Sequence, residues 1–387
     1  KSRRRTIIMD NWKTYELGEL LLYEQPSKYI VDSTNYDNSY AIPVLTAGKS
    51  FILGYTNEED GIYPQEGLPV IIFDDFTTSS KYVDFSFKVK SSAVKILKPN
   101  TNLVLPKYIF YRMQIIQFEH STHKRYWIQQ YSKLKVTIPD IAEQKKVVEQ
   151  IEEMLLQLDN GEKLLQKTKE QIVFYRQVVL KEVFKNIKEM QTIAKMSQVV
   201  TSGSRGWAKY YADEGARFIR ITDLTRDKIS IKDNNIQFVK LPEKVEGKRS
   251  RLKENDVLIS ITADLGSIAL VPEDIEEAYI NQHIAMIRFN NVAQGRFMAW
   301  YLKSDYGQKD LLKNRRGGGK LGLGLDDIKN TLVPVVDNTF AKKVVELIDS
   351  RMLICDKIEE IIMKVLKQTE ALKQSILNIA FEGRIQS

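Results

Sequence analysis

The sequence is poor in sulfur and imidazole, with one cysteine and three histidines among 387 residues. The lone cysteine, Cys355, excludes a disulfide within the chain and fits a reducing compartment, so we expect a cytoplasmic protein. Because zinc prefers cysteine and histidine ligands, no metal site is expected. Apolar runs of about 18 residues are also absent, so no membrane partner is expected.

Signatures of catalysis are missing as well. The chain contains no nucleophile elbow of the form GxSxG and no Asn-Pro-Pro-aromatic signature of adenine methyltransferases. One stretch, "RRGGGKLGLGLDD" at Arg315–Asp327, resembles a phosphate-binding loop, but the P-loop pattern requires Ser or Thr after its Gly-Lys pair. Leu321 follows Lys320, and Asn314 stands where the first glycine belongs. We therefore predict a protein that is not an enzyme and holds no cofactor of its own.

The composition does provide for packed cores and a basic surface. Hydrophobic residues make up 43% of the chain, and the formal net charge is +8. A chain of this length predicts roughly two to four domains. The positive charge predicts a polyanionic partner.

The strongest feature is an internal repeat. The 40 residues that begin at Lys145 match the 40 that begin at Lys342, an offset of 342 − 145 = 197, and about 14 of the 40 positions are identical. Each copy predicts a long helix with apolar residues at coiled-coil spacing. The first stripe is Ile151, Leu158, Leu165, Ile172 and Val179, and the second is Ile348, Cys355, Ile362, Thr369 and Ile376. Ile358, Val365, Leu372 and Ile379 broaden the apolar face of the second copy. An ordinary bundle core would explain one such stripe. Two matched copies instead favour two helices that pack on each other and act as a spacer.

Short β-type runs separated by Gly, Asn and Asp lie before each helix, for example "LPVIIFDDF" and "DVLISITADLGSIALV". The predicted fold class is therefore α+β, with two mainly β parts and two long helices in a repeated arrangement. The predicted domains are 1–137 (first β part), 138–190 (first helical spacer), 191–332 (second β part) and 333–387 (second helical spacer).

Each β part places a basic loop at nearly the same distance before a proline. Lys320 lies 14 residues before Pro334, and Lys124 lies 15 residues before Pro139. Basic loops can supply phosphate contacts, while side chains that reach base edges supply specificity. Solvated turns are the alternative interpretation.

Two other motifs receive structural interpretations. Asp74 and Asp75 in "FDDFT" invite an acid–base or metal role, but no third ligand is identifiable, so a turn or cap role is favoured. His283 in "INQHIAMIRF" is interpreted as a structural histidine.

These motifs together resemble the specificity subunit of type I restriction-modification systems. The resemblance covers essentially the whole chain and rests, from its beginning to its end, on "WKTYELGEL", "VTIPDIAEQKKVVEQIE", "LKENDVLISITADLGSIALV", "INQHIAMIRF" and "LKQSILNIAFEGRIQ". The segment "VPVVDNTFAKK" lacks the Pro-x-x-Glu-Gln form found before the first helix, and a partner contact is expected to be weaker there.

The resemblance implies a DNA reader without catalytic activity. Two target recognition domains would each read half of a split double-stranded DNA sequence, and the two helices would pair antiparallel and set the length of the unread spacer. Two methyltransferase subunits, which carry S-adenosylmethionine, would dock on this scaffold, and restriction/translocase subunits would join them. The alternatives are the recognition subunit of a related type II system and a coiled-coil scaffold that binds proteins.

The predicted DNA-contacting residues come from the loops and strand connections of both β parts. In the first they are Thr46, Lys49, Tyr55, Asn57, Lys81, His120, His123, Lys124, Arg125 and Tyr126. In the second they are Ser204, Arg205, Lys209, Tyr210, Arg220, Asp223, Arg315, Arg316, Gly317, Gly318, Gly319 and Lys320.

Overall fold

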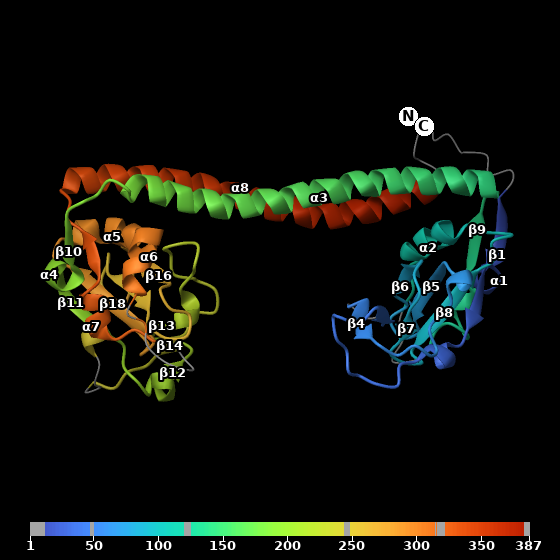
Figure 1. Cartoon of the computed structure of the whole chain (residues 1–387), viewed down its shortest axis with the longest axis horizontal. Helices are drawn as coiled ribbons and strands as arrows, with labels where there is room; N and C mark the ends of the chain where they lie inside the picture. The colour runs from blue at the N-terminus through green and yellow to red at the C-terminus, as the bar shows by residue number, and fades with distance from the viewer. Residues whose placement is uncertain are drawn as a thin grey trace. The chain divides into compact units, whose positions relative to one another are not determined.

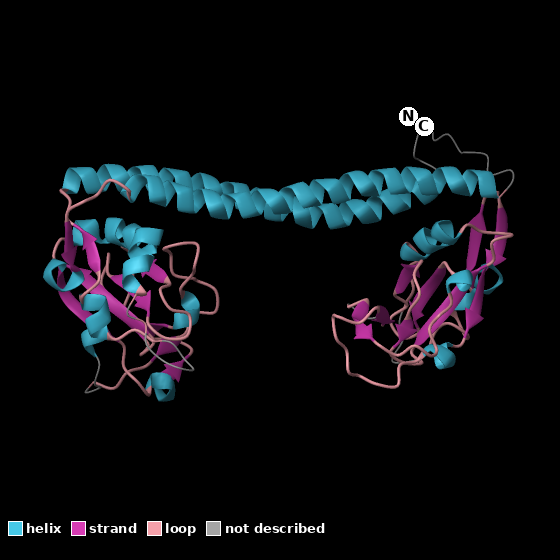
Figure 2. Ribbon diagram, viewed as in Figure 1, coloured by secondary structure: helices cyan, strands magenta, loops and turns pink. Residues whose placement is uncertain are grey.

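The computed structural model describes residues 12–46, 50–119, 125–243, 248–313, 315 and 322–382. Its fold is α+β, as expected from the sequence (Figures 1 and 2). The chain divides into two compact units: unit 1 contains residues 1–164 and 364–387, and unit 2 contains residues 165–363. Each unit combines one mainly β part, called here a globe, with segments of both long helices.

The first globe contains two sheets and a separate strand pair. Its four-stranded sheet has the order β2-β8-β5-β6, its three-stranded sheet has the order β4-β3-β7, and β1 pairs with β9. Within the three-stranded sheet, β3 and β7 run parallel. The elements are β1 (Lys13–Glu16), α1 (Leu17–Leu20), β2 (Leu21–Glu24), β3 (Ile42–Leu45), β4 (Ile52–Thr56), β5 (Val70–Asp74), β6 (Ser80–Val83), β7 (Lys88–Val89), β8 (Val94–Pro99), α2 (Pro106–Gln114) and β9 (Lys135–Ile138).

The second globe repeats this topology with one additional strand, β12. Its sheets have the orders β11-β18-β15-β16 and β12-β14-β13-β17, β13 and β17 run parallel, and β10 pairs with β19. The internal repeat therefore extends from the helices to the globes. The strands are β10 (Met190–Thr192), β11 (Ser197–Ser202), β12 (Tyr211–Ala212), β13 (Ala216–Ile219), β14 (Phe238–Val239), β15 (Val257–Ser260), β16 (Ile268–Leu270), β17 (Ala278–Ile280), β18 (Ile284–Phe289) and β19 (Leu332–Pro334). The helices are α4 (Ile193–Met196), α5 (Gly295–Lys303), α6 (Asp305–Leu311) and α7 (Leu325–Lys329).

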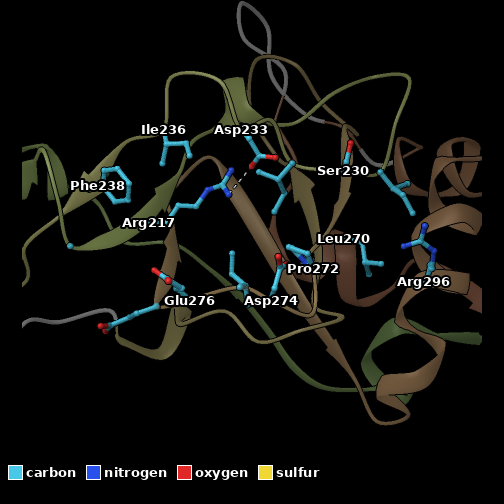
Figure 3. A pocket seen from close by; sticks show the side chains of 15 residues that line it. Arg217, Ser230, Asp233, Ile236, Phe238, Leu270, Pro272, Asp274, Glu276 and Arg296 are labelled. Carbon is cyan, nitrogen blue, oxygen red and sulfur yellow. Dashed lines mark ion pairs between the residues drawn. The ribbon is translucent and has the colours of Figure 1, made fainter. Parts of the chain in front are cut away.

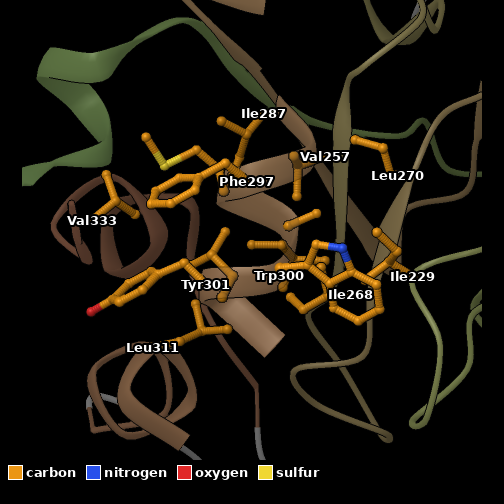
Figure 4. Close-up of a cluster of buried hydrophobic side chains, with 14 of the residues drawn as sticks. Ile229, Val257, Ile268, Leu270, Ile287, Phe297, Trp300, Tyr301, Leu311 and Val333 are labelled. Carbon is orange, nitrogen blue, oxygen red and sulfur yellow. The ribbon is translucent and has the colours of Figure 1, made fainter. Parts of the chain in front are cut away.

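In each unit, a helix of the globe packs between the four-stranded sheet and the long helices. In unit 2, α5 contributes Phe297, Trp300 and Tyr301 to a core that also contains Val257 and Ile287 of the sheet (Figure 4). In unit 1, Tyr108 of α2 makes an edge-on ring contact with Phe381, with centroids 5.2 Å apart. Burial of these large aromatic side chains stabilises the attachment of each globe to its helices.

The two long helices are α3 (Ile141–Phe184) and α8 (Asn338–Phe381). In unit 1, Lys373 forms ion pairs with Glu162 at 2.9 Å and Asp159 at 3.1 Å. In unit 2, Arg176 pairs with Asp356 at 2.6 Å and Glu359 at 3.0 Å. Towards the ends of the helices, Ile151 shares the core of unit 1 with Phe381, and Phe184 shares the core of unit 2 with Ile348. Within each unit, residue numbers along α3 therefore rise as those of their α8 contacts fall, so the segments run antiparallel.

The heptad prediction is confirmed for the second helix, where all five positions, Ile348, Cys355, Ile362, Thr369 and Ile376, are buried. Burial also raises the pKa of the Cys355 thiol. The four residues expected to broaden that apolar face are instead exposed: Ile358, Val365, Leu372 and Ile379.

Buried glutamines fasten the long helices to the globes. Gln144 in α3 accepts a hydrogen bond from Leu105 N at 2.8 Å and donates to the carbonyls of Leu103 and Pro139. The repeat offset places Ala341 at the matching position of α8. In the second globe the glutamine comes from the globe instead of the long helix. Gln294 donates to the carbonyl of Val336, two residues before α8, at 2.9 Å.

Candidate nucleic-acid interface

Several strands of the second globe end or begin at one edge, called here the second loop edge (203–205, 261–264, 281–283 and 322–323). Strand β18 begins there, because Ile284 pairs with Ser260, the last residue of β15, and Ala285 pairs with Ser202, the last residue of β11. The carbonyl of Ile219, at the end of β13, accepts a hydrogen bond from Asn281 N at 3.0 Å. Loops from four strands therefore meet at this edge.

The glycine-rich segment that follows Arg315 returns to the globe at the second loop edge. Gly322 forms a β-bridge with Thr262, and Leu323 N donates to the carbonyl of Ile261 at 3.0 Å. Arg315 itself is exposed. The predicted contact residues Arg316, Gly317, Gly318, Gly319 and Lys320 lie outside the described residues.

Beside this anchor lies a polar group that sequence reasoning did not select for DNA contact. The His283 ring bonds through Nδ1 to the Thr262 hydroxyl at 2.7 Å and through Nε2 to the Gln282 amide at 2.9 Å. These contacts fit the structural role predicted for His283. Thr262, Gln282 and His283 are only half-buried, so hydroxyl and amide groups that can pair with base edges lie at the loop anchor.

A carboxylate stabilises the turn that carries Thr262. Asp264 accepts hydrogen bonds from Arg226 and from the Ser267 hydroxyl, the latter at 2.8 Å. Partial burial raises the pKa of Asp264, but these bonds and the charge of Arg226 outweigh it and lower the pKa below its usual value. Ala263 in this turn has a left-handed backbone, with φ of 56°.

Four predicted residues of the second globe lie at or next to this edge. Ser204 bridges to Asn281, and Arg205 is exposed beside it. Asp223 requires a correction: its carboxylate is buried, accepts from Arg220 N at 2.8 Å and caps a short 3₁₀ turn, so it serves the fold of the turn. The Arg220 guanidinium donates to the carbonyl of Asn235 at 2.8 Å.

Lys209 and Tyr210 lie elsewhere. The Tyr210 carbonyl accepts from Lys240 N, next to β14 and the beginning of β13, and the Lys209 ammonium lies 4.9 Å from the Tyr210 ring centroid. Because the second loop edge contains the end of β13, this pair is not brought to it.

The first globe has a matching edge, called here the first loop edge (46, 75–79, 90–92 and 125–127). Val94, the first residue of β8, pairs with Asp74, the last residue of β5, and Lys90 N donates to the carbonyl of Leu45 at 3.0 Å. The basic segment is anchored here in the same way as in the second globe, because Tyr126 N donates at 3.0 Å to the carbonyl of Asp75, directly after β5. In both globes, the residues that follow the basic run are thus bonded directly after equivalent strands, β5 and β15.

Asp74 has the turn role predicted for it, whereas Asp75 is structural in another way, as one half of a buried ion pair. Asp74 Oδ1 accepts from Phe76 N at 2.8 Å and Thr77 N at 3.2 Å, which closes the turn. Asp75 is only 1% exposed, accepts from Trp127 N at 2.8 Å, and lies 3.4 Å from the buried Lys95 ammonium.

The predicted contact residues of the first globe lie in different places. Tyr126 requires a correction, because its ring is buried and packs against Phe118 at 5.1 Å, so it does not reach solvent. Arg125 is exposed, Thr46 lies at the edge, and Lys81 lies in β6 one residue after the turn. The predicted contacts Lys49, His120, His123 and Lys124 fall outside the described residues.

Tyr55 and Asn57 are not brought to this edge. Strand β4 runs antiparallel to β3, with Thr56 opposite Ile42, so both residues lie at the far end of that strand pair. Lys90 and Phe76, by contrast, are exposed at the edge and were not selected from the sequence. The signal available in the sequence was an aromatic residue, Phe76, directly after the paired aspartates of a predicted turn.

A cavity of about 580 Å³ lies at the opposite end of the second globe (Figure 3). It is lined near the beginnings of β13 and β17 by Asp274, Glu276 and Glu277, and by Arg217, which pairs with Asp233 at 2.9 Å. Carboxylates outnumber cations in this lining and repel phosphate, so this cavity is unsuited to DNA.

Among the described residues, no cluster of three or more His, Cys, Asp or Glu side chains could hold a metal ion. No described helix is both long enough and apolar enough to cross a bilayer.

Comparison with known proteins identifies the family. The model of the "Type I restriction modification DNA specificity domain" matches residues 9–173 and again 183–368. The chain is 30% identical to the EcoR124I/EcoR124II specificity subunit of Escherichia coli over 363 residues, covering 89% of this chain and 87% of that one. It is 22% identical to the MjaVIII specificity subunit of Methanocaldococcus jannaschii, covering 98% and 94%.

Solved structures agree in fold. One, from work on complex assembly and conformational transition of the type I R-M system, has a TM-score of 0.71 at 15% identity and covers 97% of this chain and 98% of that one. The HsdS subunit of Thermoanaerobacter tengcongensis has a TM-score of 0.55 at 15% identity, with both chains fully covered. The chain therefore belongs to the type I restriction-modification specificity subunits, which recognise DNA and are not catalytic.

Proposed function

We propose that each globe reads one half of a bipartite, asymmetric DNA target through its loop edge. The observation that supports this most strongly is the equivalence of the two edges: Tyr126, which follows one basic run, bonds to the residue directly after β5, and Leu323, which follows the other, bonds to the residue directly after β15. The chemistry at the two edges differs, with Phe76, Lys90 and Arg125 at the first and Thr262 and Gln282 at the second. Equivalent positions with different side chains suit two half-sites of different sequence.

In this proposal the long helices set the unread spacer between the half-sites. The 44 residues of α3 correspond to roughly 66 Å of helix. Ion pairs and buried heptad positions join α3 to α8 within both units, so the pair resists bending better than a single helix would.

Methyltransferase subunits would dock on the long helices, one on each unit. Large apolar side chains are exposed on the helical segments of both units, which is typical of protein interfaces. In unit 1 they are Leu156, Leu164, Val365, Leu372 and Ile379, and in unit 2 they are Val173, Phe174, Leu347, Leu353, Ile354, Ile358, Ile361 and Met363. S-adenosylmethionine would be held by those subunits, and restriction/translocase subunits would complete the complex.

A heptad insertion tests the proposal. Seven residues added to both α3 and α8 lengthen the pair by about 10.5 Å, or about 3 base pairs of B-DNA, while preserving the apolar register. Methylation mapping should then show a spacer longer by about three base pairs and unchanged half-sites. A heptad added to α3 alone is the control, and it should abolish methylation because the pairing is lost. Altered half-site letters would contradict the proposal.

A further inference from the structure

Phe76 is an exposed aromatic side chain at the tip of the turn between β5 and β6. Its exposed fraction is 41%, and among the described residues no other ring packs against it. Isolated exposed apolar residues are common on protein surfaces. Phe76 differs from these in two ways: hydrogen bonds hold the turn that carries it, and Arg125 is anchored close to that turn.

The turn that carries Phe76 is closed from both sides. Asp74 N donates to the carbonyl of Ser79 at 2.8 Å, and Thr78 N donates to the carbonyl of Asp74 at 2.9 Å. The Asp74 carboxylate also accepts from the backbone N–H of Phe76. Thr78 has a left-handed backbone with φ of 56°, a conformation that costs energy for a β-branched residue. A turn held in this way presents its ring with little loss of entropy on binding.

A cationic residue, Arg125, is anchored close to the turn that carries this ring. Asp75, directly before Phe76, accepts through its carbonyl from Tyr126 N and through its carboxylate from Trp127 N. Arg125 directly precedes Tyr126, and Phe76 directly follows Asp75, so this backbone bond brings the two segments together. The Arg125 side chain is exposed. A guanidinium that contacts phosphate beside an aromatic face that contacts a base is a typical pairing in nucleic-acid binding.

We propose that Phe76 contacts the bases of the first half-site directly, by inserting at a base step or stacking on an unpaired base. The ring would act as a wedge while Arg125 holds the adjoining phosphate. The inference rests on the proposed function and adds to it a residue that deforms DNA.

The second globe should read its half-site without such a wedge. Its matching turn, between β15 and β16, also has a left-handed residue, Ala263 with φ of 56°, but residues 261–267 contain no aromatic side chain. The two halves of the target would therefore differ in distortion as well as in sequence.

The test uses the complete complex with its methyltransferase partner and target duplexes with a single 2-aminopurine at successive positions. Wild-type complex should raise the fluorescence at one position of the first half-site, since unstacking relieves quenching. Phe76→Ala should remove that signal and weaken binding by about 5- to 150-fold, the range for loss of one stacked base. Phe76→Trp should keep the signal. Leu22→Ala, which removes another exposed apolar side chain of the same globe but opposite Lys98, away from the first loop edge, should leave both unchanged.

The outcomes separate the two proposals. Wild-type affinity and signal in Phe76→Ala would overturn the wedge, as would a wild-type complex that binds its bipartite site without any fluorescence rise in the first half. A wild-type complex that prefers no bipartite site would overturn the proposed function and the wedge with it. Thermal unfolding checks that each variant is folded. Because Phe76 is exposed, its replacement should leave the melting temperature unchanged.

Discussion

Asp75 joins the segment that begins at Arg125 to the four-stranded sheet of the first globe. Removing its carboxylate should destabilise both the segment and the sheet. Asp75 and Lys95 are 1% and 2% exposed, and their charged groups lie 3.4 Å apart. Asp75→Ala leaves the Lys95 ammonium buried without its counter-ion and leaves Trp127 N without its acceptor. Loss of one partner of a buried ion pair costs about 3–5 kcal/mol, a large fraction of the roughly 5–15 kcal/mol that stabilises a typical domain.

The assay is a double-mutant cycle in urea unfolding of the full chain. Asp75→Asn and Lys95→Met should each destabilise the protein, and the double variant should be more stable than the sum of the two losses predicts, because no charge remains buried alone. Hydrogen exchange should accelerate in residues 70–99 and 125–138 and stay unchanged in unit 2. Additive losses, or Asp75→Ala costing less than about 1 kcal/mol, would refute the reasoning.

Three further predictions concern the long helices and α5. Arg176→Met in unit 2, where the guanidinium is buried, should cost about 2–4 kcal/mol in urea unfolding, whereas Lys373→Met in unit 1, where the ammonium is 26% exposed, should cost about 1 kcal/mol or less. Gly161→Ala should stabilise the chain by about 0.5–1 kcal/mol in the same assay, because α3 continues through Gly161 and an added Cβ meets no atom within 4 Å. Burial lowers the pKa of Lys303 from 10.5 to about 8, so the unfolded state binds more protons above pH 8 and stability should rise by about 1.5 kcal/mol from pH 8 to about pH 9.5. Lys303→Met should flatten that rise; an unchanged slope would contradict the assignment.

Sequence periodicity predicted the helices well, because burial along a helix follows local spacing. Ile348, Cys355 and Ile362 are buried as their seven-residue repeat requires. The same reasoning failed for Ile358 and Leu372, which are apolar but exposed. Spacing identifies an apolar face, but it does not say whether that face is covered within the chain or by another protein.

The loops were harder to interpret, because a loop has no period from which inside and outside can be read. Tyr126 follows a basic run and suggested a DNA contact, yet its ring completes the core of unit 1. Asp223 similarly caps a turn. The position of His283 beside Thr262 depends on the pairing of β15 with β18, which are separated by β16 and β17 in the chain. Such non-local pairing is not visible in local sequence patterns.

The most direct test of the central claim is an exchange of the first globe. Residues 1–137 are replaced by the corresponding part of a specificity subunit with a different target, and methylated sites are mapped genome-wide in cells that carry the hybrid. The account predicts that one half-site changes to that of the donor while the other half-site and the spacer length stay as they were. A hybrid that leaves both half-sites unchanged, or alters both, would contradict it.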